Sequence, residues 1–161
     1  MNLNPIPYFE DEKSKPKEGL PVVEREAVNV VIYDPSVGKV LCLDWSNFNW
    51  KTFIIGGVEG EEDVVDAALR EITEETGYKN VEFVSEICKT RSGYFAAHKN
   101  ENRISNATCL LFKLLNDEKD EISAEENSIH TLVWIPIEEV GDFVNLSSQK
   151  YLWEKVKDNL K

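Results

Sequence analysis

The chain has 161 residues, 42% of them hydrophobic and 30% charged, and a formal net charge of −12 at pH 7. This length predicts one globular domain that buries its core without disulfides or structural metals. The negative charge argues against duplex DNA as a partner, because such binding depends on neutralising phosphates. No apolar run approaches the roughly 18 residues of a membrane span, so we expect no membrane partner.

Residues 1–19 are rich in proline and charge and lack hydrophobic periodicity. They predict a flexible N-terminal arm or linker ahead of a single domain at 20–161. The start has no apolar segment of the secretory type. Cys42, Cys88 and Cys109 are far apart in apolar surroundings without a C-x-x-C pair, which predicts buried free thiols and a cytoplasmic location.

Six segments with β-branched or alternating apolar residues predict strands, three in the first half of the domain and three in the second. The expected strands are 22–33, 39–44, 52–55, 81–90, 104–115 and 131–135. Between them we expect turns at 34–38 and 91–93, an aromatic loop at 45–51 and an acidic loop at 116–128. A helical turn from Pro136 and an amphipathic helix at 147–160 close the chain.

A helix is predicted at 64–76, between Asp63 as its N-terminal cap and Gly77 as its left-handed C-terminal cap. At 100° per residue its buried stripe consists of Val65, Ala68, Leu69, Ile72 and Thr76. The carboxylates Glu71, Glu74 and Glu75 fall on an adjacent arc. The chain therefore predicts an α/β sandwich with a mixed sheet.

These carboxylates oppose ordinary helix electrostatics. Glu71 and Glu75 are like charges at i, i+4, and Glu74 and Glu75 lie in the last turn, where the helix dipole favours cations. A hard divalent cation would remove both penalties, because Mg²⁺ takes carboxylate and carbonyl oxygens and is shared with substrate phosphates. It would also polarise a phosphoryl oxygen and acidify water, while a spare glutamate accepts the proton.

The spacing resembles the signature of the Nudix hydrolase family. Five residues separate Gly56 from Glu62, and seven separate Glu62 from Arg70-Glu71-Ile72. After one further residue come Glu74-Glu75, and after another comes Gly77. Tyr78 stands where the family usually has an aliphatic residue, in a core position. The resemblance implies a Nudix-type α/β/α sandwich with a mixed sheet.

The resemblance also implies the roles of these residues in hydrolysing a nucleoside diphosphate linked to another group. Glu71, Glu74 and Glu75 would bind Mg²⁺ or Mn²⁺ with a backbone carbonyl near Gly56. Arg70 would orient the carboxylates, with Glu62 beside it. The general base is open between Glu71 and a loop glutamate, for which Glu125 and Glu126 are positioned.

The flanking segments are similar to Nudix modules joined to leucyl-tRNA synthetases, over residues 20–140. The alternative to an enzyme is a regulatory module that senses a nucleotide without cutting it, including one appended to an aminoacyl-tRNA synthetase. The intact glutamate set argues for the enzyme. A calcium-binding structural helix is a third reading, and the chain lacks the loop spacing of an EF-hand.

The expected partner is a nucleotide-derived small molecule, and the oligomeric state is open between a monomer and a homodimer. Substrate contacts are predicted from cations that could meet phosphates and aromatic rings that could stack on a base. These residues are Arg25, Trp45, Phe48, Tyr94, His98 and Arg103. Trp50 favours a core position and His130 a structural one. Tyr94 lies near the place of a tyrosine in diadenosine-polyphosphate hydrolases, which makes dinucleoside polyphosphates the runner-up substrate class.

Overall fold

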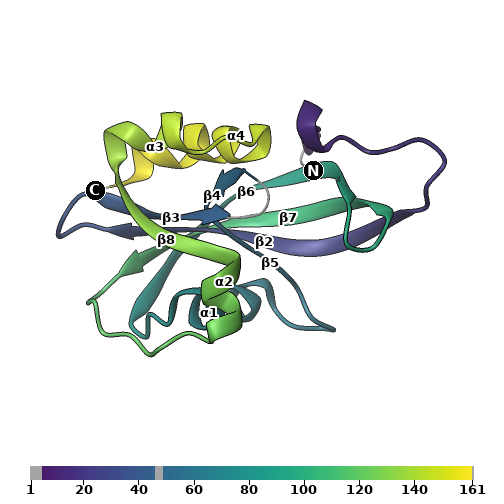
Figure 1. Cartoon of the computed structure of the whole chain (residues 1–161). Helices are drawn as coiled ribbons and strands as arrows, with labels where there is room; N and C mark the ends of the chain where they lie inside the picture. The colour runs from purple at the N-terminus through teal and green to yellow at the C-terminus, as the bar shows by residue number, and fades with distance from the viewer. Residues whose placement is uncertain (1–4, 46–48, 161) are drawn as a thin grey trace.

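The computed structural model describes residues 5–45 and 49–160. Within these ranges a mixed sheet lies between two helical layers, with α1 and α2 on one face and α3 and α4 on the other (Figure 1). The strands are β1 (Tyr8–Phe9), β2 (Val22–Asp34), β3 (Lys39–Trp45), β4 (Trp50–Thr52), β5 (Ile54–Gly57), β6 (Val81–Ala96), β7 (Glu101–Leu114) and β8 (His130–Pro136). The helices are α1 (Val64–Thr76), α2 (Ala124–Ile129), α3 (Ile137–Phe143) and α4 (Ser147–Val156), with 3-10 turns at Glu12–Ser14 and Lys157–Asn159. The predicted α/β/α sandwich is confirmed.

Strand β2 organises the sheet. It pairs in parallel with β7 along Val22–Tyr33 and in antiparallel fashion with β3 and β5. β6 and β7 form a long antiparallel hairpin, and β8 pairs with β3. The continuous apolar run at 109–112 is buried in β7, as expected for a strand covered on both faces.

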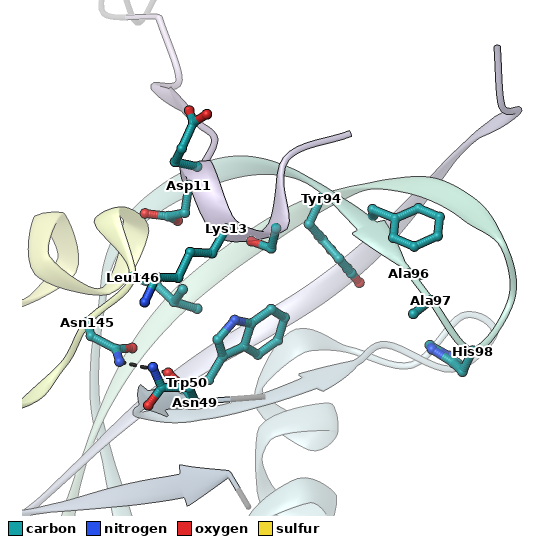
Figure 2. Close-up of a pocket in the computed structure, with 13 residues that line it drawn as sticks. Asp11, Lys13, Asn49, Trp50, Tyr94, Ala96, Ala97, His98, Asn145 and Leu146 are labelled. Carbon is teal, nitrogen blue, oxygen red and sulfur yellow. Dashed lines mark hydrogen bonds between the residues drawn. The ribbon is translucent and has the colours of Figure 1, made fainter. Parts of the chain in front are cut away.

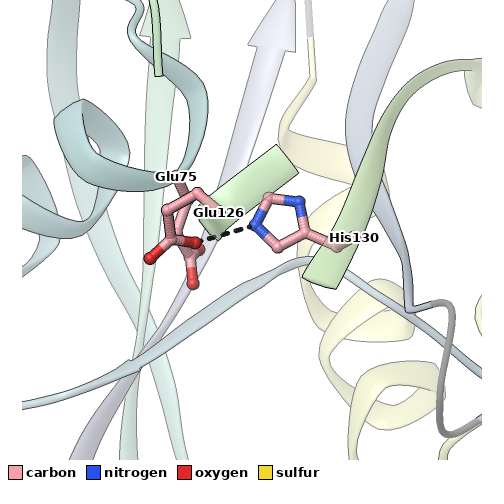
Figure 3. Close-up of side chains that lie close together, drawn as sticks. All are labelled: Glu75, Glu126 and His130. Atoms are coloured by element: carbon pink, nitrogen blue, oxygen red, sulfur yellow. Dashed lines mark ion pairs between the residues drawn. The ribbon is translucent and has the colours of Figure 1, made fainter. Parts of the chain in front are cut away.

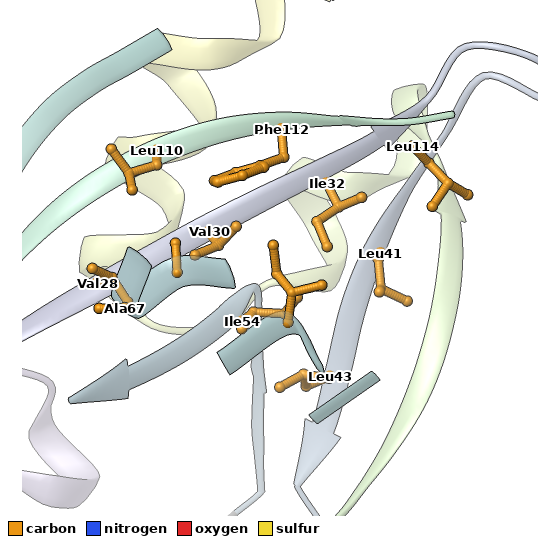
Figure 4. Close-up of a cluster of buried hydrophobic side chains, with 12 residues drawn as sticks. Val28, Val30, Ile32, Leu41, Leu43, Ile54, Ala67, Leu110, Phe112 and Leu114 are labelled. Atoms are coloured by element: carbon orange, nitrogen blue, oxygen red, sulfur yellow. The ribbon is translucent and has the colours of Figure 1, made fainter. Parts of the chain in front are cut away.

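Two hydrophobic cores fill the spaces between the layers. Alternate residues of β2 point to opposite faces, so Val30 and Ile32 pack toward α1 while Val31 and Tyr33 pack toward α3 and α4. Figure 4 shows the first core, which joins residues of β2, β3, β5 and β7 to Ala67 of α1. Leu152, Trp153 and Val156 of α4 are buried in the second core, as the sequence predicts.

Helix α1 has the predicted ends. The Asp63 carboxylate accepts a hydrogen bond from the Val65 N–H at 3.1 Å, and Gly77 adopts φ 77°. The predicted stripe is wrong at Leu69, which is exposed. The buried residues are Ala67, Ala68, Glu71, Ile72, Glu75 and Thr76. The helix is therefore rotated so that two carboxylates form part of its buried face.

Two other predicted elements differ from the structure. The predicted turn at 91–93 is wrong: these residues lie in the C-terminal part of β6. A Cβ at Gly93 would overlap the Tyr8 hydroxyl, and glycine in a strand often marks such a close approach. The segment 116–128, expected to be an acidic loop, includes most of α2, whose N-terminus is capped by the Ser123 hydroxyl, which accepts a hydrogen bond from the Glu126 N–H.

Residues 5–19, expected to form a flexible arm, lie against the domain. β1 pairs with Arg91 and Ser92 of β6, and the Asp11 carboxylate accepts a hydrogen bond from the Ser147 N–H at 3.0 Å. The Lys17 N–H donates to the Asn102 side chain at 2.9 Å. The division into 1–19 and 20–161 stays a prediction.

The three cysteines are free, with Cys42 and Cys109 buried and Cys88 partly exposed. Among the described residues, no helix is long and apolar enough to cross a membrane.

Candidate active site

The candidate site lies where the second half of α1 faces the end of β5. Glu71 and Glu75, one helical turn apart, are only 9% and 6% exposed. Glu71 packs so closely on Gly56 that a Cβ at residue 56 would overlap the carboxylate. Glycine at this position therefore lets the strand backbone approach an acidic side chain, which places the Gly56 peptide next to the helix.

Arg70 gathers the carboxylates on one side of the site. Its guanidinium donates to both oxygens of Glu62 at 3.0 Å, to Glu71 at 2.8 Å and to Glu74 at 3.3 Å. It also donates to the Gly57 carbonyl at 2.8 Å, which ties the β5 loop to α1. The hydrogen bonds to Glu62 raise the pKa of Arg70, and those from Arg70 lower the pKa of Glu62. The planar fork of arginine suits this bidentate contact.

Glu75 turns away from this network toward α2 and β8. Its Oε2 is buried without a hydrogen-bond partner among the described residues, and it lies beside Glu126 and His130 (Figure 3). Burial, together with the charges of Glu71 and Glu126, raises the pKa of Glu75 to about 9. Burial also raises the pKa of Glu71, although Arg70 opposes that shift.

These donors fit a divalent cation. Glu75 carries a buried oxygen that nothing in the described chain satisfies, and hard cations take carboxylate and carbonyl oxygens. Glu71 lies one helical turn from Glu75 and against Gly56, and Glu74 lies on the exposed side of the same helix. The assignment of Gly56, Glu71, Glu74 and Glu75 as ligands stays a prediction that this arrangement supports.

The structure separates the two candidate loop glutamates. Both are in α2, where Glu125 is exposed and Glu126 approaches Glu75 and His130. Glu126 is therefore the α2 carboxylate adjacent to the α1 cluster.

The predicted substrate residues are dispersed. Tyr94 and His98 line a cavity of about 660 Å³ on the α4 side of the sheet (Figure 2). Arg25 approaches Gly57, and Arg103 is paired with Glu101 at 3.2 Å. Trp45 packs against His130 with ring centroids 5.2 Å apart. Phe48 lies outside the described residues.

The cavity combines aromatic and cationic side chains from distant parts of the sequence. Trp50 meets Tyr94 edge to face with ring centroids 6.2 Å apart, and Lys13 of the N-terminal arm extends into the same space (Figure 2). Asn145 and Leu146, between α3 and α4, complete one wall. Its volume lies within the range of small-molecule sites.

Several of these residues were not predicted from the sequence. His130 follows Glu126 at i, i+4, a spacing that could have indicated their contact at the end of α2. Lys13 and Asn145 carry no such signal, because they reach the cavity only through the docking of the N-terminal arm on α4 and β6.

Comparison with known proteins gives a consistent result. The model of the NUDIX domain matches residues 23–155. A C. elegans Ap4A hydrolase binary complex is 25% identical, with a TM-score of 0.66, over 84% of this chain and 97% of that chain. A second structure of C. elegans Ap4A hydrolase is 23% identical, with a TM-score of 0.64, over 86% of this chain and 100% of that chain.

The E. coli dihydroneopterin triphosphate pyrophosphohydrolase shares the fold at 18% identity, with a TM-score of 0.59, over 85% of this chain and 99% of that chain. No match was found among curated proteins.

Proposed function

This chain belongs to the NUDIX family and is a Nudix hydrolase, and from that premise we propose that it hydrolyses the phosphoanhydride of a nucleoside diphosphate linked to a further group. The reaction is attack of water at one phosphorus, which releases a nucleoside phosphate. The cofactor is Mg²⁺ or Mn²⁺.

One observation carries this proposal: two buried glutamates on α1, one against Gly56 and one with an unsatisfied oxygen, occupy positions of the family signature. A solvated acidic helix would leave its carboxylates in water, where they carry no desolvation penalty. Burying an ionisable carboxylate without a partner costs several kcal/mol, on the order of the penalties measured for buried charges. A cation that binds there offsets this cost.

Each residue then has a chemical task. Glu71, Glu75 and the Gly56 carbonyl would hold the cation, which when bound supplies charge neutralisation for the phosphates and a lowered pKa for water. Arg70 keeps Glu71 in position and joins α1 to the Gly57 carbonyl. Glu126 is placed to take the proton of the attacking water, because it faces the α1 cluster from outside the helix.

The cavity between the N-terminal arm, β4 and β6 lies on the α4 side of the sheet and the carboxylates on the α1 side, so we assign the cavity to the part of the substrate farthest from the cleaved phosphate. Trp50 and Tyr94 offer aromatic surface for a base, and stacking on such rings contributes roughly 1–3 kcal/mol per base. Lys13 and His98 place cationic and polar groups around it, which a substrate anion needs against a net charge of −12.

Within this class, dinucleoside polyphosphates are the first substrates to test. Two of the similar structures are C. elegans Ap4A hydrolases, and one of these is a binary complex. A third similar structure is the NUDIX domain of Shewanella oneidensis NrtR complexed with ADP ribose. Tyr94 lines the cavity, consistent with the tyrosine expected of diadenosine-polyphosphate hydrolases.

The experiment is a substrate panel with millimolar Mg²⁺ or Mn²⁺, followed by ³¹P NMR and chromatography of the products. The panel contains dinucleoside polyphosphates, nucleoside diphosphate sugars, ADP ribose and nucleoside triphosphates. We expect metal-dependent release of a nucleoside phosphate from at least one of them, and loss of this release in Glu75→Gln. Metal-dependent binding across the panel without any product would favour the nucleotide-sensing module.

A further inference from the structure

Three side chains from separate elements converge beside α1: Glu75 from α1, Glu126 from α2 and His130 from the start of β8 (Figure 3). One ligand atom of each lies within 4.8 Å of the others. Ligands bound at about 2.0–2.2 Å to one ion lie up to about 4.4 Å apart, so a small contraction would let all three reach the same cation.

We propose that His130 supplies a nitrogen ligand to a divalent cation held with Glu75 and Glu126, which gives the site a preference for transition-metal ions such as Mn²⁺ and Co²⁺ over Mg²⁺. This proposal rests on the proposed function, because Glu75 and Glu126 belong to both: Glu126 would bind the cation through one carboxylate oxygen and accept the proton of the attacking water at the other. It adds a ligand that the family signature, a set of glutamates and glycines, does not contain.

The buried atoms of this group lack ordinary partners. His130 is 3% exposed, and neither ring nitrogen has a hydrogen-bond partner among the described residues; the same holds for Glu75 Oε2. The His130 Nε2 to Glu126 Oε2 distance is 3.4 Å, which meets an ion-pair criterion but is long for a hydrogen bond. Because each unsatisfied buried polar group costs about 1–3 kcal/mol, a shared cation would relieve several penalties together.

Arg70 divides the site into two sides. It donates hydrogen bonds to Glu71 and Glu74 and makes none to Glu75. A cation on the Arg70 side would compete with the guanidinium for oxygen atoms. On the opposite side the carboxylate of Glu75 lies beside Glu126 and His130, so a cation that shares Glu75 with them need not displace the guanidinium.

The imidazole is held in place before any ion arrives. Trp45 packs edge to face on His130, with an interplanar angle of 72°, and its indole N–H donates to the Thr52 hydroxyl at 2.9 Å. A ring fixed in this way loses little freedom on binding metal. Imidazole suits transition metals, whereas Mg²⁺ prefers oxygen ligands and keeps several waters, so the nitrogen selects between them.

The test is pulsed electron paramagnetic resonance of the full chain loaded with Mn²⁺. The chain has two histidines, so ¹⁴N modulation of the Mn²⁺ echo can be assigned by comparing His130→Asn with His98→Asn, which changes the exposed histidine of the cavity wall. We expect imidazole modulation in the wild type and His98→Asn and none in His130→Asn. The Mn²⁺ affinity of His130→Asn should fall about tenfold or more, with Mg²⁺ affinity changed less than about twofold.

Circular dichroism of both variants checks the fold, and His130→Gln repeats the test if His130→Asn unfolds. Bound Mn²⁺ without imidazole modulation in the wild type, or equal loss of Mn²⁺ and Mg²⁺ affinity in the folded variants, would overturn the nitrogen ligand while metal-dependent hydrolysis stands. A wild-type chain that binds neither ion would overturn the proposed function as well.

Discussion

Replacing Glu75 with glutamine should stabilise the metal-free protein. The side chain is 6% exposed, and burial with the charges of Glu71 and Glu126 raises its pKa to about 9, against 4.5 for an ordinary glutamate. The folded chain therefore binds this proton more tightly than the unfolded chain. As the pH rises from 4.5 toward 9, the unfolded chain releases this proton while the folded chain keeps it, so the free energy of unfolding falls; Glu75→Gln has no such proton and lacks this loss.

The size of the effect follows from proton linkage. Each pH unit between the two pKa values is worth up to 1.36 kcal/mol, so between pH 5 and pH 8 the wild type should lose about 2–4 kcal/mol relative to Glu75→Gln. For a chain of this size that difference corresponds to roughly 5–15 °C in melting temperature. Both proteins contain the other titratable groups that face position 75, so the contributions of these groups to the pH dependence largely cancel in the comparison. These groups are Glu71, Glu74, Glu126 and His130.

The assay is thermal unfolding in a chelator at constant ionic strength, from pH 5 to pH 8. Glu74→Gln is the matched control, because its side chain is 52% exposed and paired with Arg70, and it should follow the wild type. Mg²⁺ at one hundred times the dissociation constant should remove most of the difference, since the wild type gains about 2.7 kcal/mol and Glu75→Gln gains little. Parallel pH profiles for the wild type and Glu75→Gln would refute the buried, protonated carboxylate.

Three further substitutions test the supports of the site. Gly56→Ala puts a Cβ into the carboxylate behind it and should lower metal affinity at least tenfold by Mn²⁺ titration, whereas Gly57→Ala, whose Cβ finds its nearest neighbour at 3.8 Å, should not. Arg70→Met leaves its carboxylates uncompensated and should cost about 2–4 kcal/mol in urea unfolding; a loss under 1 kcal/mol would contradict the network. Gly93→Ala overlaps Tyr8 and should speed proteolysis of residues 5–19, and an unchanged cleavage rate would count against the docked arm.

Local rules predicted much of α1 and its surroundings. The cap residues Asp63 and Gly77 gave the helix its correct ends, because both act through bonds to neighbouring residues. The prediction that Leu69 is buried was wrong. Helix periodicity shows which residues share a face, but the sheet covers a face that includes the carboxylates Glu71 and Glu75. That rotation arises from tertiary packing, in which Glu71 lies directly against Gly56.

The partners across the site were harder to predict. Glu126 and His130 are brought to Glu75 by α2, a short helix inside a segment whose acidic composition resembles a loop. Trp45 was expected to stack on substrate, yet it packs on His130, a contact that depends on the register of β3 with β8. Pairings between strands more than eighty residues apart leave no mark in a local pattern.

The most direct test of the central claim is turnover of dinucleoside polyphosphates and nucleoside diphosphate derivatives by the wild type and Glu75→Gln, with Mn²⁺ and with a chelator, in H₂¹⁸O. The buried carboxylate site predicts that the wild type with metal releases a nucleoside phosphate carrying one ¹⁸O atom, and that removing metal or changing Glu75 lowers the rate by orders of magnitude while the fold survives. Equal turnover by wild type and Glu75→Gln, or turnover that persists in chelator, would contradict it.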